Sequence, residues 1–241
     1  MNNPLLLLSY PFPADGNIEG WFSTVSNWLR AFEDLAMETA LEYAVERPGP
    51  GSTGPEQPTI EQIDRLLQMA AGAGCRFGSI HIPVDPAKSD ENLGDEISTI
   101  DGWTDLASYA EFRAARISLA HPEALAQPGP RQFLQGILEY MDDMDLQAIL
   151  NVTPASMTWV KEFLDQRAAQ SKHPAGLGLP WEWIKENDGS KLPLSYLTAV
   201  RFVESQPLNA GGIACRYREI ESRFGGTKPI LVVELKQGDR T

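Results

Sequence analysis

The feature that most constrains the fold is a repeated succession of an amphipathic helix and an apolar strand. Four times along the chain, apolar residues at helical spacing are followed within a few residues by a short apolar or alternating run. This rhythm predicts an α/β fold, with α+β as the alternative, in which helices pack on a mixed β-sheet. We expect residues 1–241 to form one domain with two lobes, 1–125 and 126–241. The helix and strand pairs are 18–36 and 40–46, 60–72 and 76–83, 131–142 and 146–152, and 213–224 and 229–235.

Other stretches of the chain carry weaker patterns. Residues 112–120 and the short run 96–100 suggest strands, and 157–169 suggests a further helix. Residues 192–203 show both the helical and the strand period, so their structure is left open. Trp181 and Trp183 would share one face of a strand as a platform for a sugar or peptide, or would cover the edge of the core.

Charge excludes several classes of partner. The chain has 33 acidic and 20 basic residues, a formal net charge of −13 and a pI of about 4.7. Such a charge opposes binding to nucleic acid and to anionic membranes, and it favours a basic protein partner. Residues 1–145 carry a net charge of −15 and residues 146–241 a net charge of +2, which suggests a dedicated acidic face. The expected partner-binding residues are Asp90, Glu91, Asp95, Glu96, Asp142, Asp143 and Asp145.

The clearest catalytic candidate lies in the last apolar strand. It ends in Glu234, Leu235 and Lys236, which resembles half of the catalytic motif of restriction-endonuclease-like nucleases. The motif needs a second acid on a preceding hairpin strand, whereas the nearest acids, Glu219 and Glu221, fall on an expected helix. A metal-dependent nuclease or other hydrolase is therefore the alternative hypothesis. No catalytic residue, metal site or cofactor is predicted, and His81 is interpreted as a structural histidine.

The chain resembles the immunity protein 52 family of bacterial polymorphic-toxin immunity proteins, including those of type VI secretion systems. The resemblance rests on Ser9-Tyr10 in the first strand, on Gly20-Trp21-Phe22 and on Trp181-Glu182-Trp183. It implies a protein that is not an enzyme and that neutralises a cognate secreted nuclease toxin by binding it. The acidic residues would then face the basic surface of the toxin's nuclease domain. The oligomeric state is left open.

The apolar run near the start of the chain bears on the cellular location of the protein. Leu5 to Leu8 has no Lys or Arg before it and is too short for the apolar core of a signal peptide. No stretch approaches the eighteen or so continuous apolar residues of a membrane span. We therefore expect a cytoplasmic protein.

Overall fold

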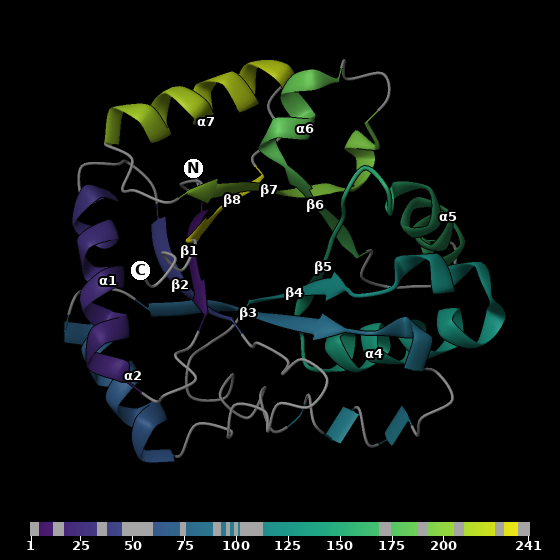
Figure 1. Ribbon diagram of the computed structural model, residues 1–241, viewed down its shortest axis with the longest axis horizontal. Helices are drawn as coiled ribbons and strands as arrows, with labels where there is room; N and C mark the ends of the chain where they lie inside the picture. The colour runs from purple at the N-terminus through teal and green to yellow at the C-terminus, as the bar shows by residue number, and fades with distance from the viewer. Residues whose placement is uncertain are drawn as a thin grey trace, which may run out of the picture.

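Eight parallel strands form a closed barrel in the computed structural model of this chain (Figure 1). The structure describes residues 5–11, 17–32, 38–44, 60–72, 76–88, 93–94, 97–98, 101, 113–168, 175–187, 192–204, 210–224 and 229–235. The strands are β1 (Leu5–Pro11), β2 (Glu38–Ala44), β3 (Arg76–Val84), β4 (Ala114–Leu119), β5 (Gln147–Asn151), β6 (Gly176–Pro180), β7 (Leu197–Glu204) and β8 (Ile230–Leu235).

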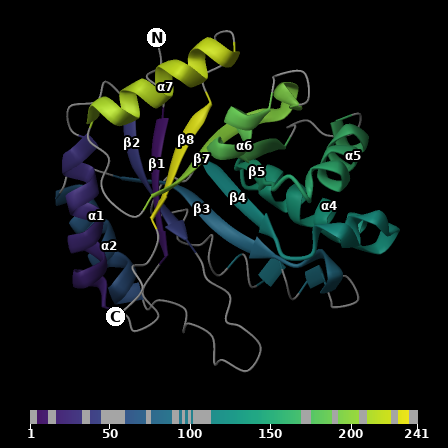
Figure 2. The same cartoon turned by 45° about the horizontal axis from the view of Figure 1, so that its top comes forward.

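Helices surround the strands, as Figures 1 and 2 show from two directions. They are α1 (Ile18–Phe32), α2 (Ile60–Gly72), α4 (Pro128–Asp143), α5 (Met157–Ala168), α6 (Trp181–Glu186) and α7 (Ala210–Phe224). The described residues also form the short 3₁₀ turns η1 (Pro86–Lys88), η2 (Pro122–Ala126) and η4 (Leu194–Tyr196). Among the helices that the structure describes, none combines the length and the apolar character that crossing a bilayer requires.

The prediction of helices on a mixed sheet is wrong, because every strand is parallel to its neighbours and the sheet closes on itself. Strand β1 pairs with β8 from the other end of the chain, with Leu7 opposite Val232. The undecided segment 192–203 contains the turn η4 followed by β7. Of the strand expected over 96–100, residues 97–98 are helical and the others lie outside the described residues.

The outer faces of the strands pack under the helices as the main apolar core. Trp21 of α1 stacks on Phe77 of β3 with ring centroids 6.4 Å apart, and Trp181 of α6 lies 5.8 Å from Phe202 of β7. Trp181 is buried and begins a helix, so it belongs to the core and does not form a platform on a strand.

The inner faces of the strands build a second, smaller apolar layer inside the barrel. Six of the strands each contribute one buried side chain to this layer. Along a strand, side chains point alternately into the barrel and toward the helices. The members of this layer are Leu7, Ala40, Ala114, Ile149, Ala199 and Val232. The layer fills the middle of the barrel. It separates the carboxyl-terminal end of the barrel from the amino-terminal end and forms an apolar floor beneath the former.

Candidate active site at the mouth of the barrel

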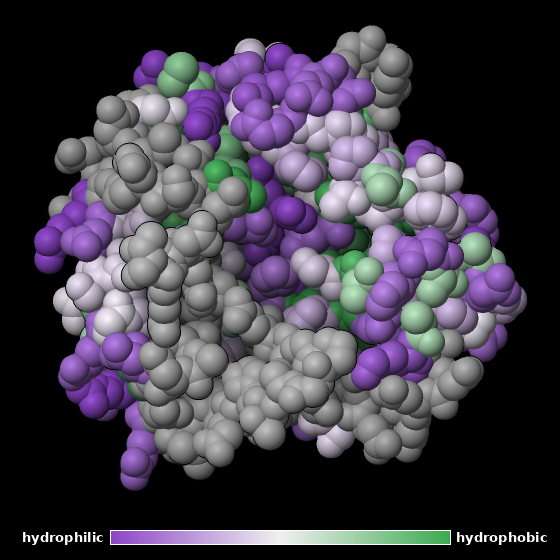
Figure 3. Space-filling view, viewed as in Figure 1, coloured by the Kyte–Doolittle hydropathy of each residue, from purple (hydrophilic) through white to green (hydrophobic). Residues whose placement is uncertain are grey.

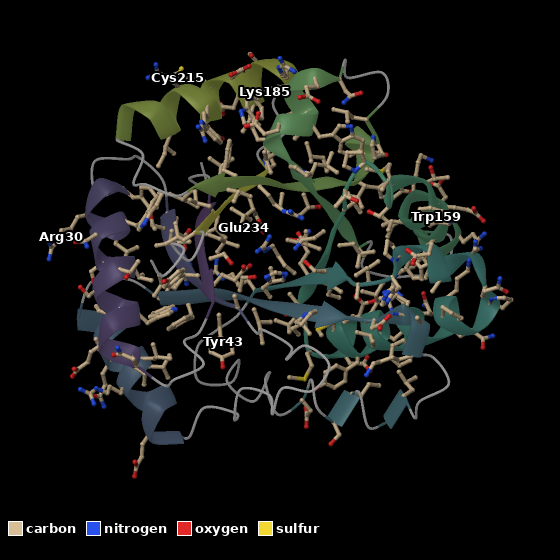
Figure 4. The ribbon with its side chains drawn as sticks, in the orientation of Figure 1. Arg30, Tyr43, Trp159, Lys185, Cys215 and Glu234 are labelled. Carbon is tan, nitrogen blue, oxygen red and sulfur yellow. The ribbon has the colours of Figure 1, made fainter. Side chains whose placement is uncertain are left out.

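A polar layer lies directly above the apolar floor. The inward position two residues further along each of the same six strands carries a polar side chain, and β3 adds two more. Because the strands are parallel, all these side chains gather at the carboxyl-terminal end of the barrel, where barrel enzymes have their active sites. Figure 4 shows Glu234 near the centre of the ring of elements. The layer consists of Ser9, Glu42, Ser79, His81, Arg116, Asn151, Arg201 and Glu234.

Arg116 of β4 is the centre of this layer and is 0% exposed. Its Nε donates to Oε2 of Glu42 at 2.6 Å and its Nη2 donates to Oε1 of Glu42 at 2.5 Å. Its Nη1 donates to Oε1 of Glu234 at 2.7 Å and to Oδ1 of Asn151 at 3.3 Å. Nη2 also donates to Oγ of Ser9 at 3.3 Å. The guanidinium, which has five N–H groups, thus makes five hydrogen bonds to four strands.

The charge of Arg116 keeps the carboxylates around it ionised. Burial alone would raise the pKa of Glu42, but the charge and hydrogen bonds of Arg116 lower it to about 2. The Ser79 hydroxyl donates a further hydrogen bond to Glu42 at 3.1 Å. Burial would lower the pKa of Arg116, but Glu42 and Glu234 raise it. A buried pair of this kind adds little net stability over apolar packing, so its position at the mouth favours a functional role.

Asn151 joins Arg116 to His81. The amide oxygen of Asn151 faces Arg116, so its Nδ2 faces away and lies 3.3 Å from Nε2 of His81 and 2.9 Å from Oγ of Ser118. Oγ of Ser118 lies 2.7 Å from the same Nε2. With an amide donor on one side, Nε2 acts as an acceptor and the Ser118 hydroxyl donates to it. The hydrogen-bond network therefore assigns the ring proton of His81 to Nδ1.

His81 is held in the neutral form. Burial lowers the pKa of His81 to about 4, and the charge of Arg116 acts in the same direction against the opposite effects of Glu42 and Glu234. At neutral pH the ring can accept a proton at one nitrogen or donate one at the other.

Arg201 of β7 is the second guanidinium of the layer. Its Nε lies 3.3 Å from Oε1 of Glu234, and its side chain is 16% exposed. Within the described ranges, no group accepts a hydrogen bond from its buried Nε. Burial lowers the pKa of Arg201, and Glu234 opposes that effect. Arg201 is thus a cation with hydrogen-bonding capacity left over, which suits a ligand with a negative charge.

The polar layer reaches the surface. The face in view in Figure 3 is hollowed near its centre, and hydrophilic residues gather in the hollow. Glu234 is 22% exposed, whereas the exposed fractions of Arg116 and Glu42 are 0%. A small solute entering the hollow would therefore meet Glu234 and Arg201 before the buried pair beneath them.

Glu234, the glutamate of the expected nuclease motif, has other neighbours than that motif requires. Glu234 is bound by Arg116 and lies near Arg201, while Glu219 and Glu221 lie on α7 and Lys236 lies outside the described residues. The acid that shares Arg116 with Glu234 is Glu42 of β2, which is a parallel barrel strand and not the preceding hairpin strand that the nuclease motif needs. His81, interpreted as structural, belongs to the polar layer. The sequence patterns do not indicate a site role for the other residues gathered here, which are Ser9, Glu42, Ser79, Arg116, Ser118, Asn151 and Arg201.

The expected partner-binding acids do not belong to this site. Asp142 and Asp143 end α4 and Asp145 lies in the turn before β5, so all three are near the amino-terminal end of β5, opposite the polar layer. Asp142 pairs with the buried Arg167 at 2.6 Å. The other four, Asp90, Glu91, Asp95 and Glu96, lie outside the described residues. A binding role for these seven acids stays a prediction.

Comparison with known proteins identifies the barrel but no family. Neither a protein-family model nor a curated protein sequence matches the chain. Two sugar phosphate isomerase/epimerase structures from Parabacteroides distasonis ATCC 8503 are similar, with TM-scores of 0.56 and 0.52 and identities of 12% and 13%. They cover 100% and 99% of this chain and 91% and 93% of their own chains. A xylose isomerase-like TIM barrel protein from Mycobacterium smegmatis, in complex with magnesium, has a TM-score of 0.52 and an identity of 13%, with 98% and 91% coverage.

These findings overturn the immunity hypothesis. The chain has the fold of TIM-barrel isomerases and not a fold of helices on a mixed sheet. The expectations of a non-enzymatic protein, of a toxin partner and of a link to type VI secretion are therefore wrong. Of the residues on which the resemblance rests, Trp21 and Trp181 are buried in the apolar core.

The magnesium in the mycobacterial structure raises the question of a metal here. Both oxygens of Glu42 and one oxygen of Glu234 already accept hydrogen bonds from Arg116. In the part of the chain that the structure describes, no three His, Cys, Asp or Glu side chains form a group that could hold a metal. A divalent ion 4 Å from a guanidinium would also be repelled by about 8 kcal/mol at an effective dielectric constant of about 20. The residues present do not fit a divalent cation.

Proposed function

We propose that this protein is an enzyme that moves a proton on a small, hydroxylated, anionic substrate, as a sugar phosphate isomerase or epimerase does. The observation that carries the proposal is the polar layer at the carboxyl-terminal mouth of the barrel. It brings two guanidinium groups, two ionised carboxylates and a neutral imidazole together over an apolar floor. The solved structures with a similar fold that are described as sugar phosphate isomerase/epimerase support this reaction class.

Arg201 is the proposed receptor for the negative charge of the substrate. Its Nε has no hydrogen-bond acceptor among the described residues, and its side chain is 16% exposed, whereas that of Arg116 is 0% exposed. A planar guanidinium matches a phosphate or carboxylate group with two parallel hydrogen bonds. The net charge of −13 makes such a local cation necessary for an anionic substrate.

Glu234 and His81 are the proposed proton-transfer groups. Oε1 of Glu234 faces the two arginines, whereas Oε2 accepts no hydrogen bond from the described residues. Burial would raise the pKa of Glu234, but Arg116 and Arg201 lower it, so the carboxylate is ionised at neutral pH. Oε2 can accept the proton of a carbon next to a carbonyl group, while Nδ1–H of His81 donates to the oxygen on which charge develops. In an isomerisation, His81 passes its Nδ1 proton to the carbonyl oxygen and takes back the proton of the adjacent hydroxyl group, while Glu234 gives its proton to the former carbonyl carbon. In an epimerisation, water supplies a proton to the opposite face of the same carbon, and Glu234 releases its own proton to water.

Proton exchange with deuterated water tests this function. The protein is incubated in D₂O with a panel of aldose and ketose phosphates and their unphosphorylated counterparts, and ¹H NMR follows the C–H signals next to the carbonyl group. We expect exchange and product formation with at least one phosphorylated sugar. Glu234→Gln should slow the exchange by about 100-fold or more, and Arg201→Gln should raise KM for the phosphorylated substrate more than it lowers kcat.

The control is Glu219→Gln, which neutralises an exposed carboxylate on α7 that pairs with Arg223 at 3.6 Å. This variant should exchange protons like the unmodified protein. Thermal unfolding of each variant checks that it is folded. Exchange that persists in Glu234→Gln, or no exchange with any sugar phosphate, would contradict the proposal.

Two further properties belong to the proposal. We expect residues 1–241 to fold as one domain, because β1 and β8 from opposite ends of the chain are paired. Denaturant unfolding followed by two spectroscopic probes should give one transition. A cytoplasmic location also remains a prediction, and fractionation of cells that express the protein checks it.

A further inference from the structure

The shell of acceptors around Arg116 resembles the surroundings of a metal ion. Carboxylate, amide and hydroxyl oxygens from four strands converge on one point: both oxygens of Glu42, Oε1 of Glu234, Oδ1 of Asn151 and Oγ of Ser9. Oxygen donors of these types are the ones that hard divalent cations take in proteins. The group at the centre of this shell is a guanidinium, and it is completely buried.

We propose that Arg116 takes the place of a divalent cation in this barrel and makes the site independent of metal. The guanidinium supplies a permanent positive charge, because arginine does not lose its proton in proteins. It also fixes the directions of Glu42, Glu234 and Asn151, which a metal ion would otherwise do. Arg116 is therefore a positioning residue, and this role holds whichever substrate the enzyme takes.

The balance of charge in the layer agrees with this assignment. Arg116 and Arg201 carry two positive charges, and Glu42 and Glu234 carry two negative charges. His81 adds none, because its pKa is lowered. A divalent ion added to this set would leave two positive charges without partners, whereas removal of Arg116 would leave one carboxylate without a partner.

The inference predicts that loss of Arg116 creates a cation site. In Arg116→Ala the oxygens of Glu42, Glu234 and Asn151 would face an empty volume with an excess of negative charge. Mn²⁺, which accepts oxygen donors and is visible by electron paramagnetic resonance, is the probe. Mn²⁺ should raise the unfolding temperature of Arg116→Ala and bind to it with saturation, at least about tenfold more tightly than to the unmodified protein.

The matched control is the double variant Arg116→Ala with Glu42→Gln, which lacks one of the carboxylates. It should lose the Mn²⁺ effect. Low millimolar guanidinium chloride should also raise the unfolding temperature of Arg116→Ala and leave that of the unmodified protein unchanged, since the free ion fits the vacated volume. Arg116→Ser, whose hydroxyl adds an oxygen donor, is the second variant if the alanine protein does not fold.

Titration of the unmodified protein with Mn²⁺ tests the proposal without any substitution. The expected result is no saturable Mn²⁺ binding and no change of unfolding temperature on adding Mn²⁺ or a chelator. Saturable binding of Mn²⁺ to the unmodified protein that Glu42→Gln abolishes would overturn the proposal. A folded Arg116→Ala or Arg116→Ser protein without Mn²⁺ binding would overturn it too. Neither result depends on catalytic activity, so the proposed isomerase function is tested separately.

Discussion

At the scale of single residues, the acidic turn between α4 and β5 has a backbone explanation. The amide of Leu146 donates to the carbonyl of Met141 at 2.9 Å, and the amide of Asp145 donates to that of Asp142 at 3.2 Å. This pair of bonds ends a helix with one residue in the left-handed region, and Asp145 has a φ of 57°. Asp142, in the last turn of α4, pairs with the buried Arg167. Two of the three aspartates therefore have local structural roles.

Replacing Asp145 tests this explanation. Asp145→Gly should raise the free energy of unfolding by up to about 1 kcal/mol, because glycine adopts a positive φ without steric cost. Asp145→Val should lower it by about 1–2 kcal/mol, because a β-branched residue is strained there. Urea unfolding measures both changes. Asp143→Ala, at an exposed neighbouring position, is the control and should stay within about 0.5 kcal/mol. A valine variant as stable as the unmodified protein would contradict the assignment.

At the scale of elements, β6 shows why a barrel strand can be hard to recognise. Its sequence, GLGLP, has glycine at the two inward positions, Gly176 and Gly178. A Cβ at Gly178 would lie 2.7 Å from Oδ1 of Asn151 and 3.5 Å from Cδ of Arg201. The missing side chain leaves room for the polar layer. The element is therefore short and glycine-rich because it lies beside the site.

Gly178→Ala should disturb the site more than the fold. The added methyl group must displace Asn151, which orients His81, so activity should fall by about tenfold or more, with a loss of about 1–3 kcal/mol in the free energy of unfolding. Gly72→Ala, at the end of α2, is the matched control, because a Cβ there meets nothing within 4 Å. Steady-state kinetics and urea unfolding measure the two effects. Equal activity of both alanine variants would show that Gly178 does not make room for Asn151.

The sequence predicted elements better than it predicted their arrangement. Six of the eight strands were expected near their observed places, because buried parallel strands are apolar runs. The glycines of β6 and the mixed periodicity of β7 conceal the other two strands, so the sequence does not show the eight repeated units that would indicate a closed barrel. The site had a readable signal: Glu42, Arg116 and Glu234 are charged residues that each have an apolar residue on both sides within a strand. Their convergence required knowledge of barrel closure.

At the scale of the whole molecule, the buried charges of the polar layer couple stability to pH. His81 keeps a neutral ring in the folded protein until about pH 4, whereas in the unfolded chain it takes up a proton near pH 6.5. The unfolded state therefore binds more protons than the folded state between these values, and stability falls as the pH falls. The lowered pKa values of Glu42 and Glu234 continue this loss below about pH 4.5. Stability from both sources is fully present at neutral pH.

Between pH 6.5 and pH 4, protonation of His81 in the unfolded chain should lower the free energy of unfolding by up to about 3 kcal/mol. The figure follows from 1.36 kcal/mol for each pH unit over which the unfolded chain holds one more proton. His81→Asn should flatten the profile in that range, because it removes the group that only the unfolded chain protonates. Urea unfolding at half-unit pH steps measures the slope.

His121→Asn is the control. The carboxylate of Asp85 raises the pKa of His121, so the contribution of His121 to stability has the opposite sign and is lost as the pH rises. His121→Asn should leave the acid-side loss in place. A His81→Asn profile as steep as that of the unmodified protein would show that the polar layer does not hold the imidazole neutral, and the assignment of its proton to Nδ1 would fall with it.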